Sequence, residues 1–209
     1  SAGNVNGLIN LDLVNEIYNG KVKTDNLNIG RVLGDNSLKS NLNTYSEFSG
    51  SGFELKNMSA NLKYDISKST FTNYDIRKSA GIINILRNNV NLNLNLFSSI
   101  ANTEIKGNIK IADLNNPSYS LKGKVNELNI SRLTNNPDDL SNLNFTFDID
   151  GRGIDLNNIN GRFDFDIGNS SYAEYNIPAL PVNIQINNSS GSNSYALKSD
   201  LLDVNVSGN

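Results

Sequence analysis

Apolar and polar residues alternate with a period of two along most of the chain. The clearest segment runs from Val90 to Leu96, where every even position is apolar and every odd position is Asn. Successive side chains of a β-strand point to opposite faces, so this alternation predicts strands with one apolar face and one solvated face. Such strands are typical of antiparallel sheets, because parallel sheets are covered on both sides. The sequence therefore predicts an all-β fold of antiparallel strands.

Other segments repeat the alternation with different residues. Phe145, Phe147 and Ile149, for example, alternate with polar residues, and the pattern returns both earlier and later in the chain. The residues predicted to line the apolar face are Leu92, Leu94, Leu96, Ile105, Ile109, Ile111, Phe145, Phe147, Ile149, Phe163, Phe165, Ile167, Val182, Ile184 and Ile186.

Helical spacing is scarce. Ile82, Ile85 and Leu86 would share one face of a short helix, so residues 79–88 are a candidate helix. Residues 131–142 predict a further helical turn or two around Pro137. Neither segment changes the predicted fold class.

The chain contains two copies of one pattern, separated by 101 residues. Residues 27–76 and 128–177 align at this offset without a gap and share 17 identities in 50 positions. Each copy also carries a Gly-x-Gly at the same place. A constant offset and a paired Gly-x-Gly do not follow from composition alone, so we infer an internal repeat.

The repeat predicts the organisation of the chain. Residues 1–104 form the first repeat unit, and residues 105–209 form the second unit and the start of a third. We expect them to make one continuous structural domain. The first four residues do not resemble a basic and then apolar signal sequence. We therefore expect the chain to be a section of a longer protein.

Composition excludes several classes of function. The chain has no His and no Cys, which removes the commonest general base, thiolate nucleophiles and the usual ligands of zinc. The net charge of −3 gives no basic excess for nucleic-acid phosphates. We therefore predict a protein that is not an enzyme, needs no cofactor or metal, and does not bind nucleic acid.

The segment Gly151-Arg152-Gly153 resembles the start of a dinucleotide-binding loop. It lacks the third Gly of that motif, and no helical pattern follows it. A bend or bulge between two strands explains the glycines better.

A second candidate site is an acidic cluster. A calcium site or a pair of glycosidase carboxylates is conceivable there, but the spacing matches no calcium-binding loop. Alternation places the acidic residues opposite the phenylalanines, so a solvated face is the better interpretation. The cluster consists of Asp148, Asp150, Asp155, Asp164 and Asp166.

The apolar face itself has two interpretations. It could be the core of a closed β-sandwich or of a β-solenoid. It could also be the continuous lining of an elongated sheet, which the long repeat favours because repeating units build elongated surfaces.

The second copy resembles a known family. Leu128–Ser131 is followed by the alternating run Leu143–Leu156, by Ile159–Phe163 and by a Ser-Tyr-x-x-Tyr at residues 171–175. This succession resembles the C-terminal repetitive region of the AsmA and TamB type proteins. The first copy departs from it, with Glu54 and Ala60 in place of Asp and Gly.

This resemblance implies a fold and a function. Members of the family have a long antiparallel sheet that curls into a half-pipe, or β-taco, with an apolar interior. They are anchored in the inner membrane of diderm bacteria and cross the periplasm. Their interior is thought to shield phospholipid acyl chains during transport between the membranes. Some members support outer-membrane protein assembly through a β-barrel partner. A structural or adhesive β-repeat protein of the cell surface is the alternative.

Overall fold

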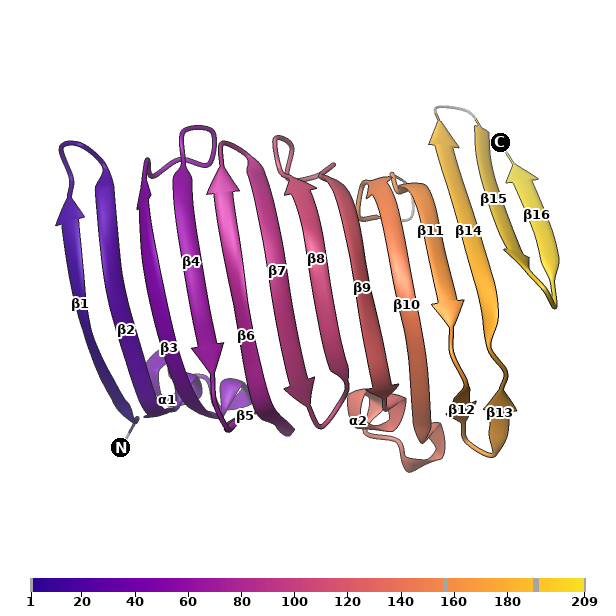
Figure 1. Ribbon diagram of the computed structural model, residues 1–209, viewed down its shortest axis with the longest axis horizontal. Coiled ribbons are helices and arrows are strands. Elements are labelled where there is room, and N and C mark those ends of the chain that lie inside the picture. The colour runs from indigo at the N-terminus through magenta and orange to yellow at the C-terminus, as the bar shows by residue number, and fades with distance from the viewer. Residues whose placement is uncertain (1, 156–157, 190–191, 209) are drawn as a thin grey trace. The chain divides into compact units, whose positions relative to one another are not determined.

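The computed structural model describes residues 2–155, 158–189 and 192–208, and about two thirds of the chain lies in strands (Figure 1). Two short α-helices and two 3₁₀ turns are the helical elements of the described residues. The predicted all-β fold is therefore confirmed.

The chain divides into two compact units. Unit 1 comprises Ser1–Asn88 and Leu92–Glu104, and unit 2 comprises Asn89–Asn91 and Ile105–Asn209. Strands β7 (Asn89–Ser98) and β8 (Asn102–Lys110) contain residues of both.

Unit 1 is a meander of antiparallel strands. Its strand order is β1-β2-β3-β4-β6-β7, and the short β5 pairs with β3 and β6. The registers from β1 to β6 are antiparallel. Besides β7, its elements are β1 (Asn4–Asp12), β2 (Ile17–Leu27), α1 (Ile29–Leu33), η1 (Asn36–Leu38), β3 (Ser40–Ser51), β4 (Ser59–Ile66), β5 (Ser69–Phe71) and β6 (Tyr74–Leu86).

Unit 2 follows the same plan. Its order is β8-β9-β10-β11-β14-β15-β16, with β12 paired to β10 and β13. The registers from β9 to β16 are antiparallel. Its elements after β8 are β9 (Ser118–Leu128), α2 (Ile130–Thr134), η2 (Pro137–Asp139), β10 (Ser141–Arg152), β11 (Asn160–Ile167), β12 (Ser170–Tyr172), β13 (Tyr175–Ile177), β14 (Leu180–Ser189), β15 (Ser192–Ser199) and β16 (Asp203–Gly208).

The bounds of the elements recur at the offset found in the sequence. β2 begins at residue 17 and β9 at residue 118, and β3 begins at 40 and β10 at 141. The helices α1 and α2 begin at 29 and 130, and β8 and β16 begin at 102 and 203. In each of these pairs the difference is 101 residues, so the aligned residues occupy equivalent places in the secondary structure.

The helix predicted over residues 79–88 is wrong, because most of this segment belongs to strand β6. Ile82, Ile83 and Ile85 are β-branched, and such side chains are restricted in a helix but pack well on a pleated surface. Strand β4 supplies hydrogen-bonding partners along the segment, with Leu62 opposite Ile83. Tertiary pairing therefore overrides the weak helical spacing. The turns predicted over residues 131–142 are present as α2 and η2.

Within each unit the strands lie side by side in a single layer (Figure 1). Among the described residues, Ala101 and Val125 are the hydrophobic residues classed as buried, and no side chain is less than 2% exposed. A sandwich core is therefore not formed within either unit. The antiparallel, sequential strand order also differs from the parallel coils of a β-solenoid.

Candidate functional site

The apolar residues of unit 2 are aligned in rows across the strands. Phe147 on β10 lies opposite Phe165 on β11, which lies opposite Val182 on β14. Residues directly opposite one another in antiparallel strands point to the same face. Rows that cross several strands therefore gather side chains that are distant in the sequence onto one surface.

Two more rows flank this one. Ile149 lies opposite Phe163, and Phe163 lies opposite Ile184. Phe145 lies opposite Ile167, and the rings of Phe145 and Phe165 meet edge to face with centroids 6.1 Å apart. We call the surface formed by these rows the apolar face of unit 2. The structure brings nine of the predicted lining residues together there, namely Phe145, Phe147, Ile149, Phe163, Phe165, Ile167, Val182, Ile184 and Ile186.

Unit 1 has an equivalent apolar face. Phe48 on β3 lies opposite Leu62 on β4, which lies opposite Ile83 on β6. Leu94 on β7 belongs to this face, because a Cβ added at Gly81 would lie 2.6 Å from its Cδ2 and 2.8 Å from a ring carbon of Tyr64. Leu92 and Leu96 share the parity of Leu94 and, like it, are half-buried.

The predicted isoleucines near residue 105 lie at the start of unit 2. Ile105 and Ile109 are on β8 and share the parity of Gly107, whose added Cβ would lie 3.0 Å from Cδ2 of Leu121. Leu121 lies opposite Ile149, so this part of β8 continues the apolar face. Ile111 follows the last residue of β8 and lies outside the strand.

Several residues of the apolar faces were not among those predicted. Leu121 and Val125 alternate on β9, and Phe48, Leu62 and Ile83 form the central row of unit 1. The signal was present, because residues 119–125 and 60–66 also alternate with a period of two. In residues 119–125 one apolar position is occupied by Gly123, which weakens the pattern.

Aromatic side chains lie over glycines on the apolar faces. A Cβ added at Gly50 would lie 2.7 Å from the hydroxyl of Tyr18, and one at Gly151 would lie 2.8 Å from the ring of Tyr119. The glycines therefore leave room for a ring from the neighbouring strand. Burial in this position raises the pKa of Tyr119 above its usual value of 10.0. Each ring thus covers backbone that would otherwise be solvated.

The opposite face of each sheet is polar, and several of its charges are paired. Nζ of Lys122 lies 2.7 Å from Oδ2 of Asp148, and Nε of Arg162 lies 2.9 Å from Oδ2 of Asp164. In unit 1, Lys21 and Glu47 approach within 2.8 Å, and the hydrogen bond from Lys21 lowers the pKa of Glu47. These side chains are 31–67% exposed, so the pairs favour solubility and register more than stability.

Four members of the predicted acidic cluster, Asp148, Asp150, Asp164 and Asp166, belong to this polar face. Asp148 lies opposite Asp164, and Asp166 lies opposite Thr146. Asp150 lies opposite Arg162, and Asp155 lies in the turn after β10. Within the described ranges, no group of three or more acidic residues is placed to hold a metal ion.

The Gly-x-Gly segments form the bends that the sequence predicted. Gly52 and Gly153 each follow the end of a strand, with φ of +77° in both units. A Cβ is disfavoured in this left-handed conformation, so glycine is required. Their amides donate at 2.9 Å to Glu16 O and Pro117 O, which anchors each bend to the residue that precedes β2 or β9.

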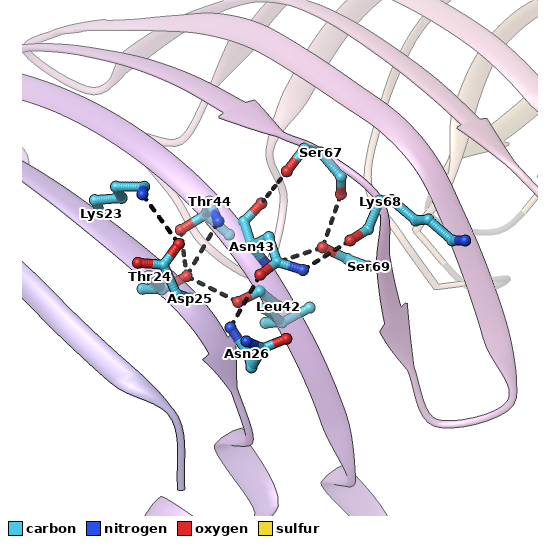
Figure 2. Close-up of polar contacts among 10 residues, drawn as sticks. All are labelled: Lys23, Thr24, Asp25, Asn26, Leu42, Asn43, Thr44, Ser67, Lys68 and Ser69. Atoms are coloured by element: carbon cyan, nitrogen blue, oxygen red, sulfur yellow. Dashed lines mark hydrogen bonds and ion pairs between the residues drawn. The ribbon is translucent and has the colours of Figure 1, made fainter.

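A cluster of Asn and Ser side chains lies near the end of β2 and the start of β3, away from the Gly-x-Gly bend (Figure 2). Asn43 Oδ1 accepts from the amide of Asn26 at 3.0 Å, and Asn43 Nδ2 donates to Lys68 O at 2.7 Å. The buried Ser69 hydroxyl accepts from the amide of Asn43 at 2.9 Å and donates to Ser67 O at 2.8 Å. We call this arrangement the Asn–Ser clasp. It supplies hydrogen-bond partners to backbone groups near the point where the register shifts between Thr24 and Leu27.

Unit 2 contains the same clasp. Asn144 Oδ1 accepts from the amide of Glu127 at 2.9 Å, and Asn144 Nδ2 donates to Asn169 O at 3.0 Å. The hydroxyl of Ser170 accepts from the amide of Asn144 at 2.9 Å and donates to Gly168 O at 2.8 Å. The identities found at the 101-residue offset thus mark positions at which a side chain bonds backbone.

Comparison with known proteins gives no relative for this chain: no protein-family model, curated protein or solved structure matches it. No helix of the described residues has the length and apolar character needed to cross a bilayer.

Proposed function

We propose that this chain is a section of a lipid-conducting surface in a protein of the AsmA and TamB type. In this proposal the sheet curls into a half-pipe, and its apolar faces shield the acyl chains of phospholipids during transport between the inner and outer membranes. The full-length protein would be anchored in the inner membrane, cross the periplasm and engage an outer-membrane β-barrel. The chain itself would have no enzymatic role.

One observation carries the proposal. Each unit presents aligned rows of large apolar side chains on a single-layer sheet, and within the described residues no second layer covers them. Extended apolar surfaces of this kind are rarely left exposed to water, so the rows need an apolar partner.

The chemistry of an acyl chain suits such a surface. Each CH₂ group removed from water contributes about 0.8 kcal/mol, so a chain laid along several rows is held firmly. Contacts with leucine, isoleucine and phenylalanine are non-directional, so moving the chain along the strands exchanges one set of contacts for an equivalent set. The polar face, with its paired charges, keeps the sheet in solution.

Lipid analysis of the purified chain tests this function. Organic extracts of the wild-type protein, examined by mass spectrometry, are expected to contain phospholipid in stoichiometric amounts. Ile184→Asp places a carboxylate on the apolar face of unit 2, and Gln185→Asp places one on the polar face at the next residue. Leu94→Asp and Asn93→Asp form the matched pair for unit 1.

The expected result separates the two faces. Ile184→Asp and Leu94→Asp lose lipid, while both control variants retain it and keep a wild-type circular dichroism spectrum. A lipid-free wild-type protein, or equal losses from variants of both faces, would overturn the proposal. A lipid-free protein that is unfolded by the apolar-face variants alone would favour the structural or adhesive alternative.

A further inference from the structure

Unit 1 contains a hollow beside the Asn–Ser clasp. It has a volume of about 690 Å³, within the range of pockets that bind small molecules. Lys68, Asp75 and Arg77 contribute charged side chains to its lining, and Asn41 and Asn43 contribute amides. All of these residues belong to unit 1, so the hollow is formed within one unit.

The backbone around the hollow is held in place by the clasp. The carbonyl of Lys68 accepts from Nδ2 of Asn43 at 2.7 Å, and the side chain of Lys68 extends away from this bond (Figure 2). Nη2 of Arg77 donates to Ser98 O at 3.2 Å and to Asn102 Oδ1 at 2.6 Å. A guanidinium has five N–H donors, so Arg77 is oriented by these bonds and retains donors for a ligand.

Two of the three charged side chains at this hollow, Lys68 and Asp75, have no ionic partner among the residues that the structure describes. Within the described part of the chain, neither the ammonium of Lys68 nor the carboxylate of Asp75 forms an ion pair. The hollow therefore offers two cations and one anion to solvent.

Unit 2 shows that the scaffold does not need these charges. Its clasp has the same hydrogen bonds, within a few tenths of an ångström, as the clasp of unit 1. The residues that stand 101 positions after Lys68, Asp75 and Arg77 are Asn169, Asn176 and Pro178. All three charges are replaced by neutral residues while the clasp is kept, so the clasp does not require them.

We propose that this hollow binds a small zwitterion in which a phosphate is joined to an amine, with the phosphate held by Lys68 and Arg77 and the ammonium by Asp75. A guanidinium and an ammonium together suit a phosphate, because Arg provides directed N–H donors and Lys provides a mobile charge. The carboxylate a few residues away would repel a simple anion but attracts a cationic group on the same molecule. The ligand is either a free phosphate-bearing amine or the headgroup of a phospholipid.

The test is a titration of O-phosphorylethanolamine into the full chain at low ionic strength. Amide NMR spectra monitor the binding. Saturable shifts are expected for the amides of Thr70, Asp75 and Arg77. Lys68→Asn, which installs the residue of unit 2, weakens binding about tenfold or more, because hydrogen bonds between charged groups are among the strongest. Asp75→Asn weakens the binding of O-phosphorylethanolamine but not the binding of inorganic phosphate. Lys124→Asn removes one positive charge from unit 2 and changes the affinity less than twofold.

Two outcomes would overturn the proposal: Lys68→Asn binding like wild type, or inorganic phosphate competing as well as the zwitterion. Dihexanoylphosphatidylethanolamine, used below its micelle concentration, identifies the source of the ligand. Binding at least tenfold tighter than the soluble probe, with the gain lost in Leu94→Asp, indicates a lipid headgroup. Equal affinities that are insensitive to Leu94→Asp indicate a free phosphate-bearing amine. If the purified chain carries no lipid, the titration with O-phosphorylethanolamine is still expected to show binding. The proposed function and this binding site can therefore fail separately.

Discussion

The Asn–Ser clasp makes a quantitative prediction about stability. Ser69 is 4% exposed, and its hydroxyl makes two bonds to backbone, at 2.9 Å from the amide of Asn43 and 2.8 Å from Ser67 O. Ser69→Ala removes both bonds and leaves a part-buried amide without its acceptor. A lost hydrogen bond costs about 1 kcal/mol and an orphaned buried donor about 1–3 kcal/mol, so we expect a loss of about 2 kcal/mol in the free energy of unfolding.

Urea denaturation followed by circular dichroism measures this loss. The midpoint should fall while the slope with urea stays constant, because the surface exposed on unfolding is unchanged. Ser170→Ala should cost the same in unit 2, where the two bonds have the same lengths. Ser67→Ala is the control: its exposed hydroxyl makes one bond of 3.4 Å, and its removal should change stability by less than about 0.5 kcal/mol. If both buried serines can be replaced at no greater cost than Ser67, the hydroxyls of the clasp do not contribute to stability.

Three further predictions concern single residues. Gly151→Ala should lower the free energy of unfolding by about 2 kcal/mol, because the new Cβ would lie 2.8 Å from both a backbone oxygen of β11 and the ring of Tyr119. Gly208→Ala is the control: its Cβ would have no atom within 4 Å, so the change should be nearly neutral in thermal or urea unfolding. Because the pKa of Tyr119 is raised in the folded state, its contribution to stability is present below about pH 10 and is lost as the pH rises further. The free energy of unfolding of Tyr119→Phe should therefore depend less on pH between 9 and 11 than that of wild type. An equal dependence would show that Tyr119 does not contribute in this way. The pKa of Glu47 is lowered, chiefly by the hydrogen bond from Lys21, so its contribution to the free energy of unfolding is present above about pH 4.5 and is lost as the pH falls. The free energy of unfolding of Glu47→Gln should therefore fall less steeply at acid pH than that of wild type.

The sequence predicted the strands well where large apolar residues alternate without interruption. Residues 90–96 and 163–167 lie within β7 and β11, because alternation reports directly on a surface with one wet side. The strand that contains Ile82 and Ile83 was mistaken for a helix, because consecutive isoleucines break the alternation. In β6, Ile83 points to the apolar face while the more exposed Ile82 lies opposite Lys63 on the polar face.

The features that depend on contacts between distant residues could not be predicted. The role of Ser69 depends on Asn43, 26 residues away, and neither residue type indicates a buried position. The charged hollow needs Lys68 before the turn between β5 and β6 and Asp75 and Arg77 after it, and the pairing of these strands is not encoded in a pattern of polarity. The repeat offset gave an indirect signal: identities between the copies mark the clasp, and differences between them mark the hollow.

The recurrence of the element bounds every 101 residues determines which changes of length such a gene can tolerate. Phe48 has an even number and Ile149 an odd one, yet both stand at the same position of their strands and on apolar faces. Duplication or loss of a whole repeat therefore preserves which way every side chain points. Insertion of one residue in the middle of β10 would instead turn Phe145 and Phe147 to the opposite side of the strand relative to Gly151. Lineages of such a protein should accordingly differ by whole copies, and insertions of other lengths should be confined to the turns.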